Sequence, residues 1–504
     1  MTTVTVSDRP AGAAKADALV LASVKTDGGA ELAAGHGLSK KAAAHVNAAL
    51  RNTQAGGSPD ELVRLSDVPE VAAPLVVVSG LGAAPEKSGF TAETLRRAAG
   101  AATRSLSGSA KVSVRFPGSD AALVGAVAEG ALFGAYAFLE HRGESAKRAK
   151  APVKAVIVHT DGAKDRGVKA AVKRAGVLAG HQNYARDLVN TAPNLLYPQT
   201  FAESVRARAA GTAVSVRVMD EKALAKAGCG GILGVGQGSA RPPRIVTLTY
   251  KPAKARASLA YIGKGITFDS GGLCLKPGAS MVTMKCDMAG AAAVAAAIFT
   301  IAELGLPVAV TGYLCLAENM TGSNAQRPGD VVTMRGGKTV EIINTDAEGR
   351  LVMGDGLALA SEKQPDAIVD IATLTGAAVM ALGHRTSAVM ANDDDLRERV
   401  HAVATGAGES MWQMPLVEEV RSGMDSTVAD FKHTGDRVGG MMVAATFLSE
   451  FIGKDKAGRL IPWAHLDIAG PAFNESAAFG YTPKGGTGYG VRTLVGLAED
   501  HAAK

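Results

Sequence analysis

The chain has 504 residues, of which 47% are hydrophobic and 20% charged, and its formal net charge is +6. These values describe an ordinary globular protein with a large core and room for two domains, and they exclude a disordered chain. The four cysteines show no CxxC spacing, so they do not form a recognisable zinc or disulfide framework.

The N-terminal third alternates strand-like apolar runs with alanine-rich helical stretches, as expected for a βαβ domain. The runs are 18–21, 75–78, 111–114 and 155–158, and the helical stretches are 91–106 and 121–140. The start lacks the basic and apolar regions of a signal peptide, so we expect a cytoplasmic protein. We predict an α/β protein with a smaller N-terminal α/β domain over 1–165 and a linker helix over 166–190. A larger C-terminal α/β domain over 191–504 would hold a central mixed sheet flanked by helices.

Residues 142–174 form a basic stretch that follows the helical stretch 121–140. They include ten Lys or Arg against three Asp or Glu. A nucleic-acid patch and a solvated linker with a charged helix face both fit this composition. The stretch has no interleaved aromatic residues and no recognised DNA-binding motif, so we favour the solvated face and expect no nucleic-acid partner.

A glycine-rich segment begins at the apolar run 259–262, which predicts a short buried strand ending at glycines on either side of Lys264. Ligands of open α/β sheets bind at the carboxyl ends of strands, so Lys264 and Asp269 are expected where chemistry occurs. Further on, Asp287 precedes the uncharged run Met288–Ala302. This run is too short to span a bilayer and predicts a buried helix that starts beside Asp287.

Residues 344–351 read NTDAEGRL and place Asp346, Glu348 and Arg350 at alternate positions. The preceding run 340–343 predicts a strand, and in an extended segment alternate side chains share one face. Buried carboxylates need cations, and metal ions are the commonest strong ones. An exposed ladder of charges on a surface strand is the alternative.

Taken together, the two segments point to a metal site. Oxygen ligands suit Mg, Mn and, less exclusively, Zn, and four carboxylates exceed the charge that one divalent ion needs. Two lysines beside such a cluster suggest an oxyanion clamp or an amine ligand, and Cys274 and Cys286 are interpreted as packing residues. The four acids are Asp269, Asp287, Asp346 and Glu348, and the lysines are Lys264 and Lys276.

These segments closely resemble the leucine aminopeptidase family, the cytosolic two-metal exopeptidases. The similarity rests on NTDAEGRL at 344–351, GKGITFDSGG at 263–272, Lys276-Pro277 and KCDMAGA at 285–291. Weaker similarity covers most of the C-terminal half, including 183–186, 234–239, 327–330, 372–377, 465–470 and 487–488. HExxH, GxSxG and P-loop patterns are absent, which argues against other common hydrolase designs.

The resemblance implies two Mn or Zn ions per subunit. One would bind Asp269, Asp346 and Glu348, and the other Lys264, Asp269, Asp287 and Glu348, with Asp269 and Glu348 bridging. A lysine ligand must be neutral, and both burial and the metal charge lower its pKa. Lys276 would stabilise the oxyanion, and Arg350 would hold a bicarbonate ion as general base. No histidine lies near these motifs along the chain, which agrees with a bicarbonate base.

The resemblance also implies a substrate pocket and an assembly. Met284, Thr373 and Gly376 would surround the first side chain of a short peptide and favour Leu or Met. The family forms homohexamers, and 433–435 with the apolar run 441–445 could contribute to that interface, although a core helix explains the run as well.

Three functions remain open at this stage. The first is an aminopeptidase preferring leucine-like residues, and the second is a dipeptidase of the same mechanism, for example on cysteinylglycine. The third is a DNA-binding protein that retains the fold without activity. The complete set of site residues argues against the third.

Overall fold

The computed structural model describes residues 2–85 and 89–503, which form two compact units. The first unit contains Met1–Asn183 and Asn474–Lys484, and the second contains Tyr184–Phe473 and Gly485–Lys504. The helix expected near 166–190 is present as α4 (Arg166–Asn190), and the boundary between the units falls within it. Residues 474–484, which the sequence placed in the C-terminal domain, belong to the first unit.

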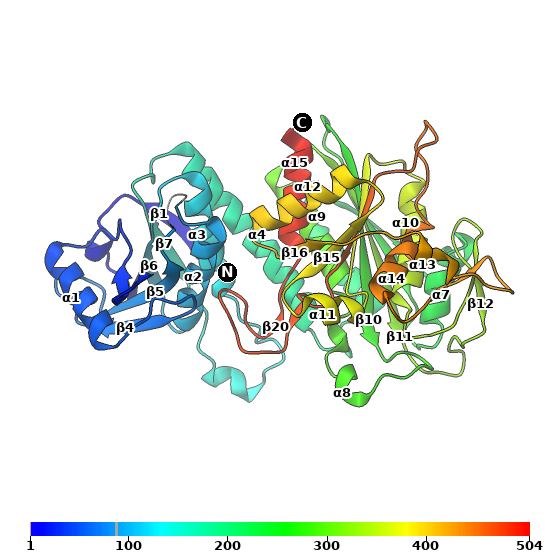
Figure 1. Cartoon of the computed structure of the whole chain (residues 1–504), viewed down its shortest axis with the longest axis horizontal. Helices are drawn as coiled ribbons and strands as arrows, with labels where there is room; N and C mark the ends of the chain where they lie inside the picture. Colours follow the sequence, from blue (N-terminus) through cyan, green and yellow to red (C-terminus); the bar gives the residue numbers. More distant parts are fainter. Residues whose placement is uncertain (1, 86–88, 504) are drawn as a thin grey trace. The chain divides into compact units, whose positions relative to one another are not determined.

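The first unit is built on a mixed sheet that has seven strands in the described residues (Figure 1, blue to cyan). The strand order is β1-β7-β6-β2-β5-β4, with β3 paired to β2, and the pairs from β1 to β5 along this order are parallel. The strand-like runs and helical stretches predicted for this region form, which confirms the α/β prediction, but the stretch predicted over 121–140 is helical only as far as Gly134. The strands are β1 (Thr3–Ser7), β2 (Ala18–Thr26), β3 (Gly29–Leu32), β4 (Leu62–Ser66), β5 (Leu75–Ala83), β6 (Lys111–Arg115) and β7 (Ala155–His159), and the α-helices are α1 (Lys40–Asn52), α2 (Ala92–Ser105) and α3 (Ala121–Gly134).

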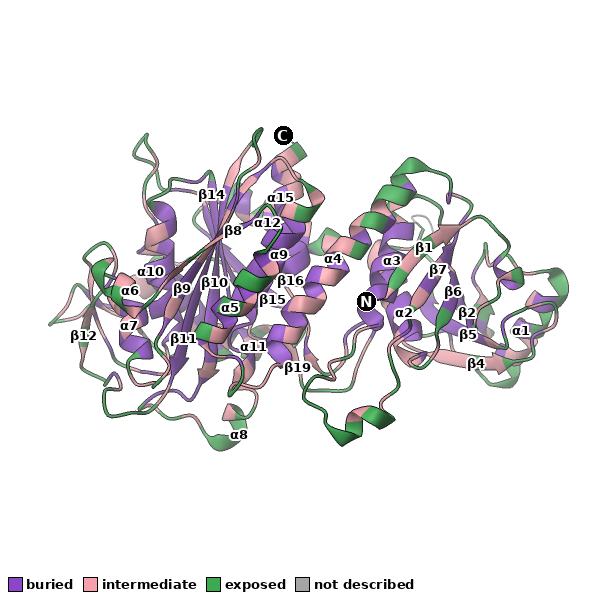
Figure 2. Cartoon of the chain, turned by 180° about the vertical axis from the view of Figure 1, so that it is seen from behind, coloured by how far each residue is buried: buried purple, intermediate pink, exposed green. Residues whose placement is uncertain are grey.

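The second unit is built on a mixed sheet of eight strands, counted over the described chain, in the order β16-β15-β18-β14-β10-β11-β9-β8. Its four central strands, β18, β14, β10 and β11, run parallel, and their residues are almost all buried (Figure 2, purple). The strands are β8 (Ser215–Met219), β9 (Arg244–Tyr250), β10 (Ser258–Asp269), β11 (Ala309–Asn319), β14 (Ala367–Ala372), β15 (Ser387–Ala391), β16 (Met411–Gln413) and β18 (Trp463–Asp467).

Helices cover both faces of this sheet (Figure 2), and in the described residues a three-stranded and a two-stranded sheet lie outside it. The helices are α5 (Pro198–Ala209), α6 (Glu221–Lys226), α7 (Gly230–Gly236), α8 (Gly278–Met281), α9 (Ala289–Leu304), α10 (Gly349–Ser361), α11 (Gly376–Leu382), α12 (Asp394–Ala407), α13 (Glu419–Ser422), α14 (Gly440–Ser449) and α15 (Val491–Ala503). The small sheets contain β12 (Val331–Thr333), β13 (Thr339–Glu341) and β17 (Phe431–Lys432), and β19 (Phe473–Asn474) with β20 (Gly485–Gly486).

Strand β10 corrects one prediction, because it does not end at the glycines around Lys264 but continues through them to Asp269. Both glycines face α9, where a Cβ on Gly263 would lie 2.5 Å from the Cα of Ala291. The two glycines allow α9 to pack closely on β10 and do not form a turn. Lys264 therefore lies inside the strand.

The buried helix predicted beside Asp287 is confirmed as α9. By length and composition, Gly278–Leu304 is the one helical stretch in the described residues that could cross a membrane. However, 83% of its apolar window is buried inside the structure, and α9 packs against β10, β11 and β14. Its apolar character is explained by this place in the core.

Candidate metal centre

Four parallel strands end at one edge of the central sheet and bring polar side chains together there. Asp269 ends β10, Asn319 ends β11 and Asp467 ends β18, while Thr373 directly follows β14. The expectation that Asp269 lies at the carboxyl edge of a sheet is confirmed. Asp269 is held there by hydrogen bonds to its Oδ1 from the Gly271 amide and the Asn319 side chain, both 2.8 Å.

The NTDAEGRL segment is a turn followed by a helix, so the prediction of an extended segment was wrong. The preceding strand, β13, ends at Glu341, and Glu348 is the N-terminal cap residue of α10 with helical angles. The alternation of acids and arginine is therefore not a strand face. The turn nevertheless directs Asp346 and Glu348 to the same place, with carboxylate oxygens of Asp269, Asp346 and Glu348 within 4.8 Å of one another.

Lys264 lies beneath the start of α10 and is almost completely buried. Its Nζ is 2.9 Å from Asp287 Oδ2 and 2.9 Å from Glu348 Oε1, and it donates to the Thr373 carbonyl at 3.0 Å. Gly349 allows this close approach, since a Cβ there would lie 2.6 Å from Lys264 Cε. Burial lowers the pKa of Lys264, but the charges of Asp287 and Glu348 outweigh it and raise the pKa above its ordinary value.

Lys276 reaches the same cluster from the loop after β10. Its Nζ is 2.9 Å from Asp269 Oδ2 and 2.5 Å from Asp346 Oδ1. Its side chain is 16% exposed against 4% for Lys264. Lys276 is therefore the lysine on the accessible side of the cluster.

The cluster has more negative than positive groups, and this imbalance shows in its acids. Burial raises the pKa of Asp287 and Asp346, and burial together with the charge of Asp269 raises that of Glu348. Among the described residues, buried Glu348 Oε2 has no hydrogen-bond partner. Raised acid pKa values and an unpartnered carboxylate oxygen are what a site built for further cations should show. The donor set therefore fits divalent metal ions.

Arg350 lies in the first turn of α10 and is buried. Its Nη1 donates to the carbonyl of His433 at 2.9 Å, while no acceptor for its buried Nε lies among the described residues. Burial lowers the pKa of Arg350 to about 10, so it stays a cation at neutral pH. The Nε of its planar guanidinium group is therefore available to donate a hydrogen bond to a small anion.

Two of the three residues predicted around the substrate side chain are linked to this cluster. Thr373 donates its hydroxyl to Asp287 Oδ1 at 2.7 Å, and the Met284 carbonyl accepts from the Asp287 amide at 3.4 Å. Gly376, the first residue of α11, is exposed, and a Cβ there would meet no atom within 4 Å.

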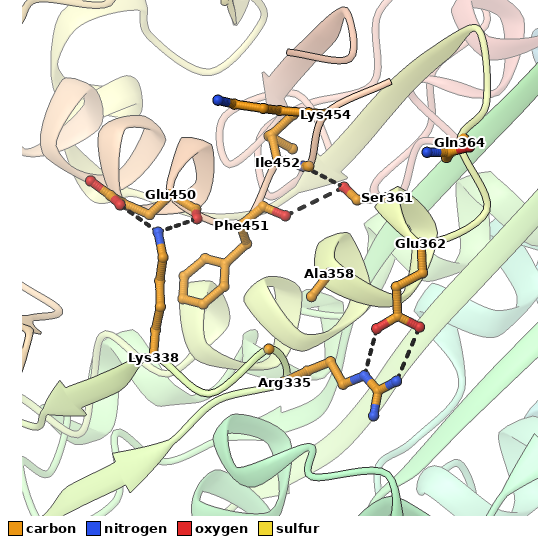
Figure 3. Close-up of a pocket in the computed structure, with 12 residues that line it drawn as sticks. Arg335, Lys338, Ala358, Ser361, Glu362, Gln364, Glu450, Phe451, Ile452 and Lys454 are labelled. Carbon is orange, nitrogen blue, oxygen red and sulfur yellow. Dashed lines mark hydrogen bonds and ion pairs between the residues drawn. The ribbon is translucent and has the colours of Figure 1, made fainter. Parts of the chain in front are cut away.

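A separate pocket of about 360 Å³ lies at the ends of α10 and α14 (Figure 3). Four of its charged side chains pair with each other: Arg335 with Glu362, and Lys338 with Glu450. Among its described residues it contains none of the predicted site residues and no unpaired acid, so it does not resemble the carboxylate cluster.

Comparison with known proteins agrees with the geometry. The catalytic-domain model of the cytosol aminopeptidase family matches residues 183–495, and its N-terminal-domain model matches residues 20–145. The chain belongs to the cytosol aminopeptidase family. The resemblance found in the sequence is thus confirmed, and the chain is a peptidase of this family.

Relatives extend over the whole chain. "Probable cytosol aminopeptidase" of Streptomyces avermitilis is 52% identical over 100% of this chain and 99% of its own length. The protein of the same name from Rhodococcus jostii is 44% identical over 97% of this chain and 95% of its own length. A solved structure, the bottromycin maturation enzyme BotP in complex with Mn, is 37% identical with a TM-score of 0.83, covering 96% of this chain and 99% of that one.

Two supporting residues of this family member escaped the sequence analysis. Asn319 orients Asp269, and it could have been found as the polar end of a long apolar strand. His433 contacts the NTDAEGRL turn, although it lies 83 residues beyond Arg350. It was instead assigned to a possible subunit interface, but it is fully buried, and α14, which contains all of 441–445, packs in the core.

Proposed function

We propose that this chain is a two-metal aminopeptidase that removes the N-terminal residue, preferably Leu or Met, from short peptides. The observation that supports this most directly is the buried group of four carboxylates and two lysines at the carboxyl edge of the sheet, with Glu348 Oε2 unpartnered. The family is common to the matched relatives, and BotP is the neighbour solved with Mn.

Asp269, Asp346 and Glu348 would hold one ion, and Lys264, Asp269, Asp287 and Glu348 the other. When bound, the two ions, Mn or Zn, would supply Lewis-acid activation of water and of the scissile carbonyl. Lys264 pairs with Asp287 and Glu348 as an ammonium, so it must release a proton before it can act as a ligand.

Lys276 and Arg350 would divide the remaining chemistry. Lys276, the more exposed lysine, would polarise the scissile carbonyl and stabilise its developing negative charge. Arg350 is anchored through Nη1 and would hold a bicarbonate ion with the rest of its fork, and that anion would accept the proton from water.

Specificity and assembly are further parts of the proposal. Met284 and Thr373 next to Asp287, with open space at Gly376, would form an adaptable apolar wall. We also propose a cytoplasmic homohexamer, since most soluble oligomers are symmetric. A dipeptidase of the same mechanism would differ only in pocket size, and no contact among the residues that the structure describes favours DNA binding.

Removal and return of metal tests the proposal. The chelated protein should lose hydrolysis of leucyl- and methionyl-anilides, and Mn or Zn should restore it, with Mg and Co as comparisons. Activity that survives complete metal removal would refute the two-metal assignment. In the same panel a preference for Asp or Glu would refute the pocket, hydrolysis of cysteinylglycine alone would favour the dipeptidase, and light scattering of an active monomer would refute the hexamer.

A further inference from the structure

His433 occupies a position fixed by the small sheet beside the metal cluster. Strand β17 pairs in parallel with β13, with Val340 opposite Phe431 and Glu341 opposite Lys432. His433 therefore comes one residue after β17, beside the point where the chain leaves β13 for the NTDAEGRL turn. Its side chain is fully buried.

Both ring nitrogens of His433 contact the backbone of that turn. The Ile343 amide donates to Nδ1 at 3.2 Å, Nδ1 also lies 3.2 Å from the Glu341 carbonyl, and Nε2 lies 2.8 Å from the Asn344 carbonyl. In the neutral tautomer in which Nδ1 accepts from Ile343, Nε2 carries the proton and donates to Asn344. Burial, with the charge of Arg350, lowers the pKa of His433 to about 4, which agrees with this neutral form.

Asn344 connects the imidazole of His433 to the backbone of Asp346 and Ala347 through hydrogen bonds. Its carbonyl also accepts the Ala347 amide at 3.0 Å, and its side-chain oxygen accepts the Asp346 amide at 3.0 Å. The imidazole thus closes a network around the turn that carries a proposed metal ligand. The histidine's own carbonyl accepts from Arg350, so one residue contacts both halves of the site.

We propose that His433 is a positioning residue, whose neutral imidazole locks the turn carrying Asp346 while its carbonyl holds Arg350 in place. It touches neither substrate nor metal and acts through these two residues. The inference rests on the proposed function for its kinetic consequences, but its effect on metal binding can be measured without any substrate.

The direct test compares His433→Phe, His433→Asn and His433→Gln. Phe removes both ring contacts, and the Asn amide is too short to reach Asn344 from the position of Nε2, whereas the Gln amide can place a donor there. Phe and Asn should lower kcat for leucyl-anilide by roughly 10–100-fold and weaken Mn binding, measured by calorimetry, by roughly 10-fold, while Gln should remain much nearer to wild type. Wild-type kcat and Mn affinity in the Asn variant would overturn the proposal, even if the Phe variant did not fold.

The matched control is His159 in the first unit, which is also buried and has both nitrogens engaged, with the Arg9 carbonyl and the Ser113 hydroxyl. His159→Phe should lower the unfolding temperature and leave kcat per folded molecule and Mn affinity unchanged. Equal losses in the two Phe variants would reduce His433 to a general structural role and overturn the proposal.

A double-mutant cycle tests the link to Arg350. In an Arg350→Ala background, His433→Phe should lower kcat by a clearly smaller factor than it does in the wild type, because part of its effect passes through that arginine. If the effects of the two substitutions on kcat were fully additive, His433 would not act through Arg350, and that part of the proposal would be wrong. If the wild type hydrolyses no peptide, the proposed function fails, and the Mn affinities alone then decide whether His433 positions the turn.

Discussion

Two buried groups of charges, one in each unit, have opposite designs. In the first unit Arg174 pairs with one carboxylate oxygen of Glu129 and Arg96 pairs with the other, both at 2.8 Å. Arg96 also pairs with Glu93. In the second unit two lysines face four carboxylates, and Glu348 Oε2 has no partner among the described residues.

This is the difference that we expect between a structural cluster and a cluster that binds metal. Both groups have ion pairs shorter than 3 Å and buried side chains, so neither distance nor burial distinguishes them. The balance of charges does distinguish the two groups, because an excess of buried carboxylates is unfavourable until cations bind beside them. We expect substitutions to affect stability in the first group and metal binding with catalysis in the second.

The largest effect should follow from removing an acid of the second group. Asp346→Ala or Glu348→Ala should abolish Mn-dependent peptidase activity together with metal occupancy, because each would remove a proposed oxygen ligand from the cluster. Metal content by mass spectrometry of the native protein, alongside turnover of leucyl-anilide, provides the measurement. Near-normal turnover in either variant would show that the imbalance of charge has another purpose.

Lys276→Ala should retain metal but lower kcat by roughly 10²–10³-fold, the usual cost of losing an oxyanion partner. Lys338→Ala is the matched control, since Lys338 also pairs with an acid, Glu450, but lies in the separate pocket (Figure 3). The control should keep normal kcat. A similar loss in both variants would indicate general damage.

Arg350→Ala should also lower kcat, but added bicarbonate or a small carboxylate should restore part of it, because in the proposed mechanism the anion itself would supply the base. The measurement is kcat against bicarbonate concentration in both variants. Rescue of Lys276→Ala without rescue of Arg350→Ala would reverse the two roles.

In the first unit, Glu129→Ala should cost up to about 3 kcal/mol of unfolding free energy, because it removes one of the two acids paired with the buried Arg96 and leaves an excess of positive charge beside it. The activity of the molecules that remain folded should not change. Denaturant unfolding with activity assayed in parallel measures both quantities. A loss of metal affinity would contradict the assignment of this cluster to structure alone.

The sequence predicted the acids and lysines of the site because they lie in short segments with strong local patterns. It failed at NTDAEGRL, where alternation indicates a strand, although the residues from Gly349 onward continue as a helix. It also ended β10 too early, since a glycine required by a neighbouring helix looks the same as a turn glycine until that helix is placed.

The order of residues along the chain does not indicate that His433 contacts the NTDAEGRL turn. Its contact with the turn depends on the two-residue pairing of β13 with β17, and such short pairings carry little pattern of their own. Asn319 was within reach, because the carboxyl-edge rule that identified Asp269 applies equally to the neighbouring strand.

The segment 474–484 has a consequence for how the protein is made. Its Tyr481 packs against Phe133 with ring centroids 5.5 Å apart and donates to Glu93, and Gly480 hydrogen-bonds Asp60 and Arg104. Tyr481 also fills the space above Gly100, where no side chain could fit. A ribosome must therefore translate the chain as far as residue 484 before the N-terminal unit receives its last piece. Until then the nascent unit exposes the surface that Tyr481 will cover, and a fragment ending at residue 183 would keep it exposed permanently.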